Sequence, residues 1–123
     1  MLLEDDEQFL KEKGYSYTTT VENSVIHIVI HGFPIPLMYQ PTQADLLIRL
    51  PAGYPQANPD MFWTRPDIML ANGAVPQAAS THESYLGQTW QRWSRHWGAA
   101  WRAGLDTLRT FIAAIQADLN RGV

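Results

Sequence analysis

The sharpest chemical candidate in the sequence is the segment Ser94-Arg95-His96, which combines a nucleophile, a cation and a base. A serine hydroxyl is barely ionised near neutral pH, so it attacks a carbonyl only when a base takes its proton. We expect His96 to be that base, and Arg95 or the nearby Arg92 to stabilise the oxyanion. Residues two apart do not share a helix face, so the pair needs a turn or a neighbouring element. Otherwise Ser94 caps a helix and His96 joins an aromatic cluster.

Four tryptophans surround this segment: Trp90, Trp93, Trp97 and Trp101. Their spacings of 3, 4 and 4 residues predict one face of a helix. We expect that face to build the core against a C-terminal helix, with Trp93 and Trp97 anchoring the reactive segment. The alternative is a partner-binding surface, because Trp and Arg dominate the hot spots of protein interfaces. A stripe of this length can also do both.

The histidines offer further candidates. His82 lies in the polar segment of residues 79–84, which is either a second hydroxyl–histidine site or an ordinary surface loop. His27 and His31 lie in a stretch rich in β-branched residues, where a strand would place them about 13 Å apart. Two ligands of one metal ion must lie closer, because metal–ligand bonds are about 2 Å long. We therefore expect no metal site and no cofactor.

The composition limits what else the chain can do. With 123 residues, 46% hydrophobic and 17% charged, it has the size and make-up of one globular domain, residues 1–123. The absence of cysteine excludes disulfides, thiolate metal sites and thioester chemistry. A net charge of −3, with nine basic residues in no long run, argues against nucleic-acid binding. The acidic N-terminus and the lack of a long apolar stretch predict a cytoplasmic protein with no membrane partner.

Hydrophobic alternation predicts the strands that would position these groups. Residues 15–31 are expected to be extended, most clearly at 25–31, where every second residue is isoleucine. Residues 32–36 contain Gly and two Pro and are expected to break that strand. Further strands are predicted at residues 44–50 and 61–63, with a rigid double turn between them at Tyr54-Pro55 and Asn58-Pro59.

Two helices are predicted to flank the strands. The first spans residues 2–13 and is ended by Gly14. In the second, apolar residues recur at helical spacing: Leu105, Leu108, Ile112, Ile115 and Leu119. Residues 65–100 have no clear period. The order predicts an α+β fold, in which a small curved antiparallel sheet carries an N-terminal helix and a packed C-terminal helix.

The stretch Leu47–Phe62 resembles the middle of a ubiquitin-conjugating enzyme. In that family a strand ends in a Tyr-Pro turn, a second proline follows, and an apolar strand comes next. Tyr54-Pro55, Pro59 and residues 61–62 hold those places here. Later parts of the family pattern are similar, in order, to Arg65-Pro66-Asp67, Asn72-Gly73, Trp101 and residues 106–119. The resemblance covers residues 25–119 and implies the ubiquitin-conjugating fold.

The chain is similar in particular to a bacterial branch, prokaryotic ubiquitin-conjugating-like family E. Its characteristic stretch resembles residues 90–96 here. That branch occurs beside genes for activating enzymes, ubiquitin-like proteins and deconjugating peptidases. The resemblance therefore implies two partners, a ubiquitin-like protein and an adenylating activating enzyme.

The resemblance ends where the family does its chemistry. Pro76 stands where the catalytic cysteine should be, and a proline side chain has no nucleophile. Arg65 replaces the motif His, and Asp67 replaces an Asn that normally supports the oxyanion. An ionised Asp would repel an oxyanion. We expect Pro76 to lie at the edge of a shallow groove, with no reactive side chain in contact.

These departures suggest that the site is rebuilt around residues 90–101. The segment would fold back so that Ser94 reaches a groove near Asp67 and Asn72. Asn72 would supply the oxyanion donor, and Asp67 would orient His96. The chain would then accept a ubiquitin-like protein as a serine oxyester and pass it to an amine. The alternative is a non-catalytic member of the fold that scaffolds the activating enzyme or the ubiquitin-like protein.

Overall fold

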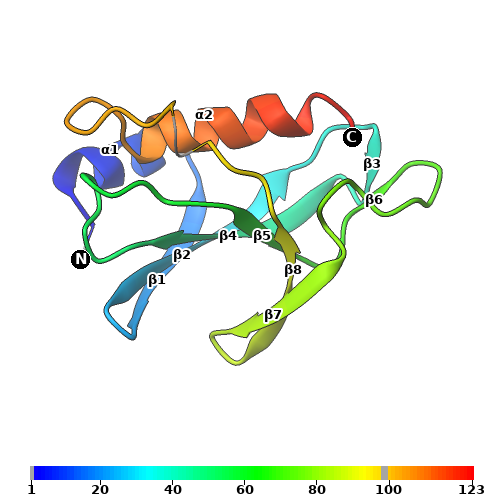
Figure 1. Ribbon diagram of the computed structural model, residues 1–123, viewed down its shortest axis with the longest axis horizontal. Coiled ribbons are helices and arrows are strands. Elements are labelled where there is room, and N and C mark those ends of the chain that lie inside the picture. The colour runs from blue at the N-terminus through cyan, green and yellow to red at the C-terminus, as the bar shows by residue number, and fades with distance from the viewer. Residues whose placement is uncertain (1, 98–99) are drawn as a thin grey trace.

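Two helices cover one face of an antiparallel sheet in the computed structural model, which describes residues 2–97 and 100–123 (Figure 1). The helices are α1 (Glu4–Glu12) and α2 (Leu108–Leu119). The strands are β1 (Ser16–Glu22), β2 (Val25–Pro34), β3 (Tyr39–Gln40), β4 (Gln43–Leu50), β5 (Phe62–Arg65), β6 (Met69–Leu70), β7 (Thr81–Tyr85) and β8 (Gln88–Trp93). Six of them form one sheet in the order β1-β2-β4-β5-β8-β7, and β3 pairs with β6. The α+β prediction is confirmed, although the main sheet has more strands than the sequence indicated.

The predicted extended region of residues 15–31 is a hairpin of β1 and β2. Its turn is Asn23-Ser24, where both residues have positive φ, 52° and 64°. Gly32, at φ 65°, was predicted to break the strand but does not. Instead the pairing of β2 with β4 shifts register between Ile30 and Phe33, and the strand continues to Pro34. A glycine in this conformation lets a strand bulge without ending it.

The main core lies between the sheet and α2. Leu108, Ile112 and Ile115 are all buried in it, as the helical spacing predicted. Each such side chain contributes about 1.5–3 kcal/mol by leaving water. Leu105 is outside the helix and 67% exposed, so that part of the prediction was wrong. The helix begins later because Thr107 caps it through a reciprocal bond with Thr110.

The predicted helical stripe of tryptophans was wrong. Trp90 and Trp93 lie on β8, which forms a hairpin with β7 around a turn at Leu86-Gly87. Residues three apart on a strand face opposite sides of the sheet. Trp93 therefore enters the main core, while Trp90 packs in a second cluster with Val29, Leu47 and Trp63. Because β8 is buried on both faces, its large residues mimic a helical spacing.

The loop between the adjacent strands β4 and β5 turns at Tyr54-Pro55 as predicted, but the second turn predicted at Asn58-Pro59 does not form. Backbone bonds from Tyr54 N–H to Pro51 O and from Ala57 N–H to Gly53 O hold the loop. Tyr54 Oη also donates to Asp6 Oδ2 at 2.6 Å, and Leu108 N–H donates to Asp6 Oδ1 at 3.2 Å. The buried Asp6 thus joins α1, this loop and the start of α2. Neither helix is long and apolar enough to cross a membrane, in the part of the chain described.

Candidate functional site

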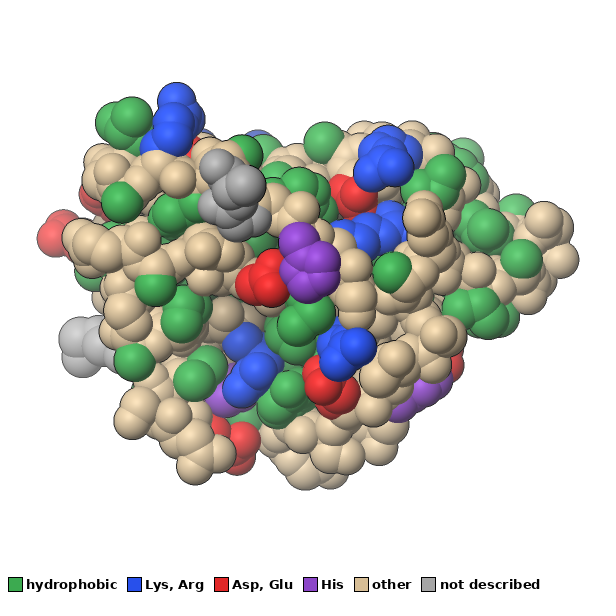
Figure 2. Space-filling view, in the orientation of Figure 1, with side chains coloured by type: hydrophobic (Ala, Val, Ile, Leu, Met, Phe, Trp, Pro, Cys, Tyr) green, Lys and Arg blue, Asp and Glu red, His purple; other side chains and the backbone are tan. Residues whose placement is uncertain are grey.

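Ser94 is the first residue after β8, and its position is fixed by backbone and side chain together. Its N–H donates to Ala78 O at 2.9 Å, and its Oγ accepts a hydrogen bond from Arg92 Nε at 2.9 Å. It is half-buried at a cleft of about 200 Å³. The cleft is lined by Gln77, Ala78, Ser94, Arg95, His96, Trp97, Asp118 and Arg121. Charged and histidine side chains gather in the middle of the face shown in Figure 2.

His96 lines the same cleft as Ser94, and its orienting partner is Asp60. The ring Nδ1 lies 2.9 and 3.0 Å from the two carboxylate oxygens of Asp60. A carboxylate accepts hydrogen bonds, so in the neutral ring this contact favours the tautomer with its proton on Nδ1 and a lone pair on Nε2. The prediction that Asp67 orients His96 was wrong, because Asp67 pairs with His82 at 2.8 Å.

Two aromatic side chains anchor the segment that carries Ser94 and His96. Trp93 is fully buried and stacks on Phe62, with ring centroids 5.1 Å apart. Trp97, which follows the segment, stacks on the same Phe62 with ring centroids 6.2 Å apart. It also contacts Phe111 edge to face, with centroids 5.7 Å apart. Both pack into the core as predicted. Trp90 is 1% exposed and therefore offers no surface to a partner.

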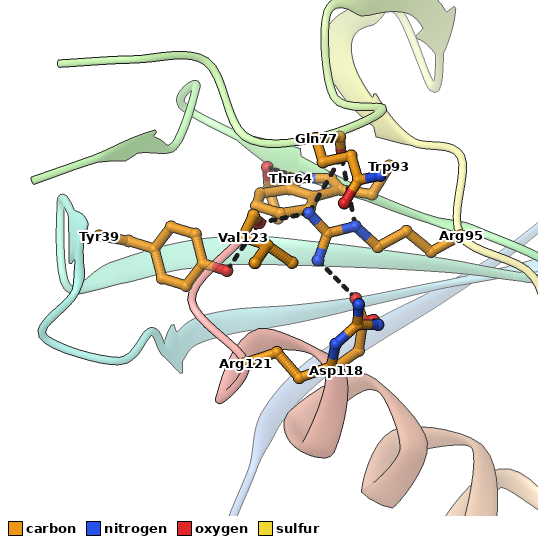
Figure 3. Close-up of polar contacts among 8 residues, drawn as sticks. All are labelled: Tyr39, Thr64, Gln77, Trp93, Arg95, Asp118, Arg121 and Val123. Carbon is orange, nitrogen blue, oxygen red and sulfur yellow. Dashed lines mark hydrogen bonds and ion pairs between the residues drawn. The ribbon is translucent and has the colours of Figure 1, made fainter. Parts of the chain in front are cut away.

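Arg95 is buried and serves the fold. Its guanidinium bonds to Asp118 Oδ2 at 2.6 Å, twice to Gln77 O, and to Val123 O (Figure 3). It also lies 4.8 Å from the centre of the Trp93 ring. Four hydrogen bonds take up most of its five N–H groups. Arg95 therefore links the segment after β8 to α2, which leaves Arg92 as the better of the two arginines predicted as alternative oxyanion donors.

Arg92 is the arginine that touches the hydroxyl. Besides Ser94 Oγ, it contacts Glu83 Oε2 at 3.1 Å, so Glu83 on β7 holds the guanidinium in place. Burial raises the pKa of Glu83, but hydrogen bonds from Trp63 and Arg92 outweigh it and leave that pKa below its ordinary value. Glu83 thus remains an anion beside Arg92 at neutral pH. A positive charge next to Ser94 suits an oxyanion that develops there.

The remaining predicted residues lie away from this cleft. Asp67 and His82 form their own exposed pair. Asn72 Oδ1 accepts from Ala74 N–H at 2.9 Å, so its side chain closes a local turn. Pro76 is buried, and its carbonyl accepts from Ala79 N–H. None of the four lines the cleft, so the expected meeting of Ser94 with Asp67 and Asn72 does not occur.

Two residues of the candidate site, Asp60 and Glu83, were not predicted from the sequence. Asp60 follows Pro59 in a loop and gives no signal of its role, because its partner lies 36 residues further along the chain. Glu83 could have been found from a hairpin at Leu86-Gly87, since that turn sets Glu83 diagonally across from Arg92. No three His, Asp or Glu side chains in residues 2–97 and 100–123 come together as a metal site.

A sequence model described as prokaryotic E2 family E matches residues 2–122. The chain belongs to this family. Its members take part in ubiquitin-like conjugation, so the partners of this protein are components of such a pathway. Neither the curated proteins nor the solved structures give a significant match.

Proposed function

We propose that this E2-family protein carries a ubiquitin-like protein as an oxyester on Ser94 and transfers it to an amine. The observation that supports the proposal best is the His96–Asp60 pair at the cleft that Ser94 lines. A base fixed by a carboxylate through one nitrogen, with the other nitrogen free, is the arrangement that activates a serine. The chain has no cysteine to form a thioester instead.

The transfer would proceed in two steps. An adenylating activating enzyme supplies the ubiquitin-like C-terminus as an activated acyl group. Ser94 Oγ attacks its carbonyl carbon, His96 Nε2 takes the hydroxyl proton, and the activating group leaves with the electrons of its bond. Arg92 stabilises the negative oxygen of the intermediate. In the second step a target amine attacks the ester carbonyl and the C–O bond to Ser94 breaks, which forms an amide. The proton held by His96 returns to Ser94 Oγ, and the proton lost by the amine goes to solvent.

A non-catalytic role is the second candidate, and one observation favours it. In the free protein Ser94 Oγ is bonded to Arg92 and has no bond to His96 among the described contacts. A hydroxyl held in this way could simply stabilise the end of β8, while the protein scaffolds its partners. Catalytic hydrogen bonds are often loose before a substrate binds, so an experiment on the loaded protein must decide.

The experiment combines the protein with the activating enzyme, ATP and the ubiquitin-like protein. We expect an adduct that survives thiol reductant and is cleaved by hydroxylamine, and Ser94→Ala should abolish it. His96→Asn should slow its formation about 10²–10⁴-fold through loss of the base. The matched control is His82→Asn, which breaks the other His–Asp pair and should leave the rate unchanged.

Circular dichroism must show that each variant is folded. If Ser94→Ala still supports full conjugation, the oxyester proposal is wrong and the scaffold is preferred. The same conclusion follows if His82→Asn slows the reaction as much as His96→Asn does.

A further inference from the structure

β1 is an open edge of the main sheet. It pairs with β2 on one side only, and Figure 1 shows no element beyond it. Six of its seven residues are exposed, and one of them, Val21, is a hydrophobic side chain that is 60% exposed. An edge strand presents a row of unpaired N–H and C=O groups to any strand that approaches.

Natural sheets usually protect such an edge, and β1 carries none of the usual protections. It has no Lys and no Pro, its only charged residue is Glu22 at the end, and it pairs with β2 without a register shift. β7, at the opposite edge, is shorter and carries Glu83, which is ion-paired with Arg92. A long, regular and nearly uncharged edge is a template for strand addition.

The hairpin determines which groups of β1 point outward. Residues that flank a two-residue turn form a hydrogen-bonded pair, so Glu22 bonds with Val25 across the Asn23-Ser24 turn. Bonded and outward-facing residues alternate along a strand. The free N–H and C=O groups therefore belong to Tyr17, Thr19 and Val21.

We propose that β1 pairs with β1 of a second copy of this chain, antiparallel and with the two-fold axis at Thr19. In this register each residue with free backbone N–H and C=O groups lies opposite another such residue of the partner. Thr19 meets the partner's Thr19, and Tyr17 meets the partner's Val21. About six backbone hydrogen bonds then join the two strands, and two six-stranded sheets become one.

The side chains agree with this register. Tyr17 packs against the main core and shares its sheet face with Val21, so the pairing covers the exposed Val21 with an aromatic ring. On the other face Thr18 meets the partner's Thr20. Glu22 lies opposite the partner's Ser16, so no like charges face each other. A strand that matches its own reverse in backbone, shape and charge favours a second copy over an unrelated peptide.

The dimer leaves the candidate site accessible. The cleft follows β8, which is separated from β1 by three strands in the sheet order. The two clefts of a dimer would therefore lie toward its opposite ends. This inference is independent of the acyl transfer proposed above, so either can fail without the other.

Single cysteines test the register directly, because the chain has no cysteine of its own. Opposite residues of a hydrogen-bonded pair have Cα atoms about 5.5 Å apart, within the range of a disulfide. Thr19→Cys should therefore form a disulfide dimer under mild oxidation. The controls Thr18→Cys and Thr20→Cys meet a threonine instead of themselves and should stay mostly monomeric. Equal cross-linking of all three variants, or faster cross-linking of either control, would overturn the proposal.

Sedimentation of the unmodified protein gives the second measurement. A small edge-to-edge interface is expected to be weak, so the dimer should be evident at about 100 µM. Val21→Lys puts a charge on the pairing edge and should give a monomer with an unchanged circular dichroism spectrum. A wild-type protein that stays monomeric at this concentration, or a Val21→Lys protein that still dimerises, would show that β1 serves no such contact.

Discussion

Arg92 and Arg95 lie on either side of Ser94, and the structure uses them in opposite ways. Arg92 is about 29% exposed and holds the Ser94 hydroxyl with support from Glu83. Arg95 is 8% exposed and holds Asp118 on α2 together with two backbone carbonyls. One guanidinium is partly exposed beside the candidate site, and the other is part of the core. The same residue type three positions apart thus contributes to the proposed chemistry in one case and to the fold in the other.

The cause of this difference is the end of β8. Arg92 belongs to the strand and lies diagonally across from its hairpin partner Glu83. Arg95 follows the strand, where the chain turns toward α2. A charge that enters the core needs a counter-ion and bonded N–H groups, and Arg95 has both. Variants that separate the two roles can therefore test the division.

Loss of Arg95 should have the largest effect on stability. Arg95→Ala leaves Asp118 buried without its closest partner and should lower the free energy of unfolding by about 3–5 kcal/mol. The matched control is Arg121→Ala, because Arg121 pairs with the same Asp118 but is 64% exposed. That control should cost about 1 kcal/mol or less. Urea denaturation measures the unfolding free energy of both variants. Equal decreases would mean that the buried Arg95–Asp118 contact contributes no more to stability than the exposed Arg121–Asp118 contact.

Loss of Arg92 should have the opposite profile. Arg92→Ala should change the unfolding free energy by about 1 kcal/mol or less, because the pair with Glu83 is partly solvated. It should slow formation of the Ser94 adduct by about 10²–10³-fold, the usual cost of one oxyanion donor. Arg121→Ala is again the control, since it removes a positive charge from the same cleft without touching Ser94. If the control slows the reaction as much, general charge and not the Arg92 contact would be responsible.

Local signals in the sequence were enough for much of the fold. The isoleucines of β2, the Tyr54-Pro55 turn and the apolar face of α2 each depend on residues close together in the chain, and all were predicted correctly. The site depends instead on distant pairs. His96 meets Asp60 across 36 residues, and Asp67 meets His82 across 15.

The hairpin of β7 and β8 explains most of the errors. Its strands are short, and β8 is buried on both faces, so its buried residues do not alternate and the spacing of Trp90 and Trp93 matches that of a helix. Because this hairpin was not predicted, Trp90 and Trp93 were assigned to a helix, and Glu83 could not be placed beside Arg92. The same omission led to the wrong partner for His96, because the direction of the chain after β8 determines which aspartate the ring can reach.

Asp6 sharpens the comparison, because it is a buried charge without the counter-ion that Arg95 has. Its partners are the neutral donors Tyr54 Oη and Leu108 N–H. Burial raises the pKa of Asp6 above its ordinary value of 3.8, and the two hydrogen bonds only partly oppose that change. The folded protein therefore binds this proton more tightly than the unfolded chain. Its unfolding free energy should fall as the pH rises from about 3.8 through the raised pKa, and then level off.

Asp6→Asn removes this titration while it keeps an oxygen that can accept from Leu108 N–H. The variant should gain stability relative to the wild type as the pH rises through that interval, and the difference should then stay constant. Urea denaturation across the range measures it, with Glu4→Gln as a control that removes an exposed carboxylate from the same helix. A difference that shrinks with rising pH would mean that the charged form of Asp6 is the favoured one. In that case the dipole at the start of α2 would stabilise the Asp6 carboxylate, as the Asp118 carboxylate stabilises the Arg95 guanidinium.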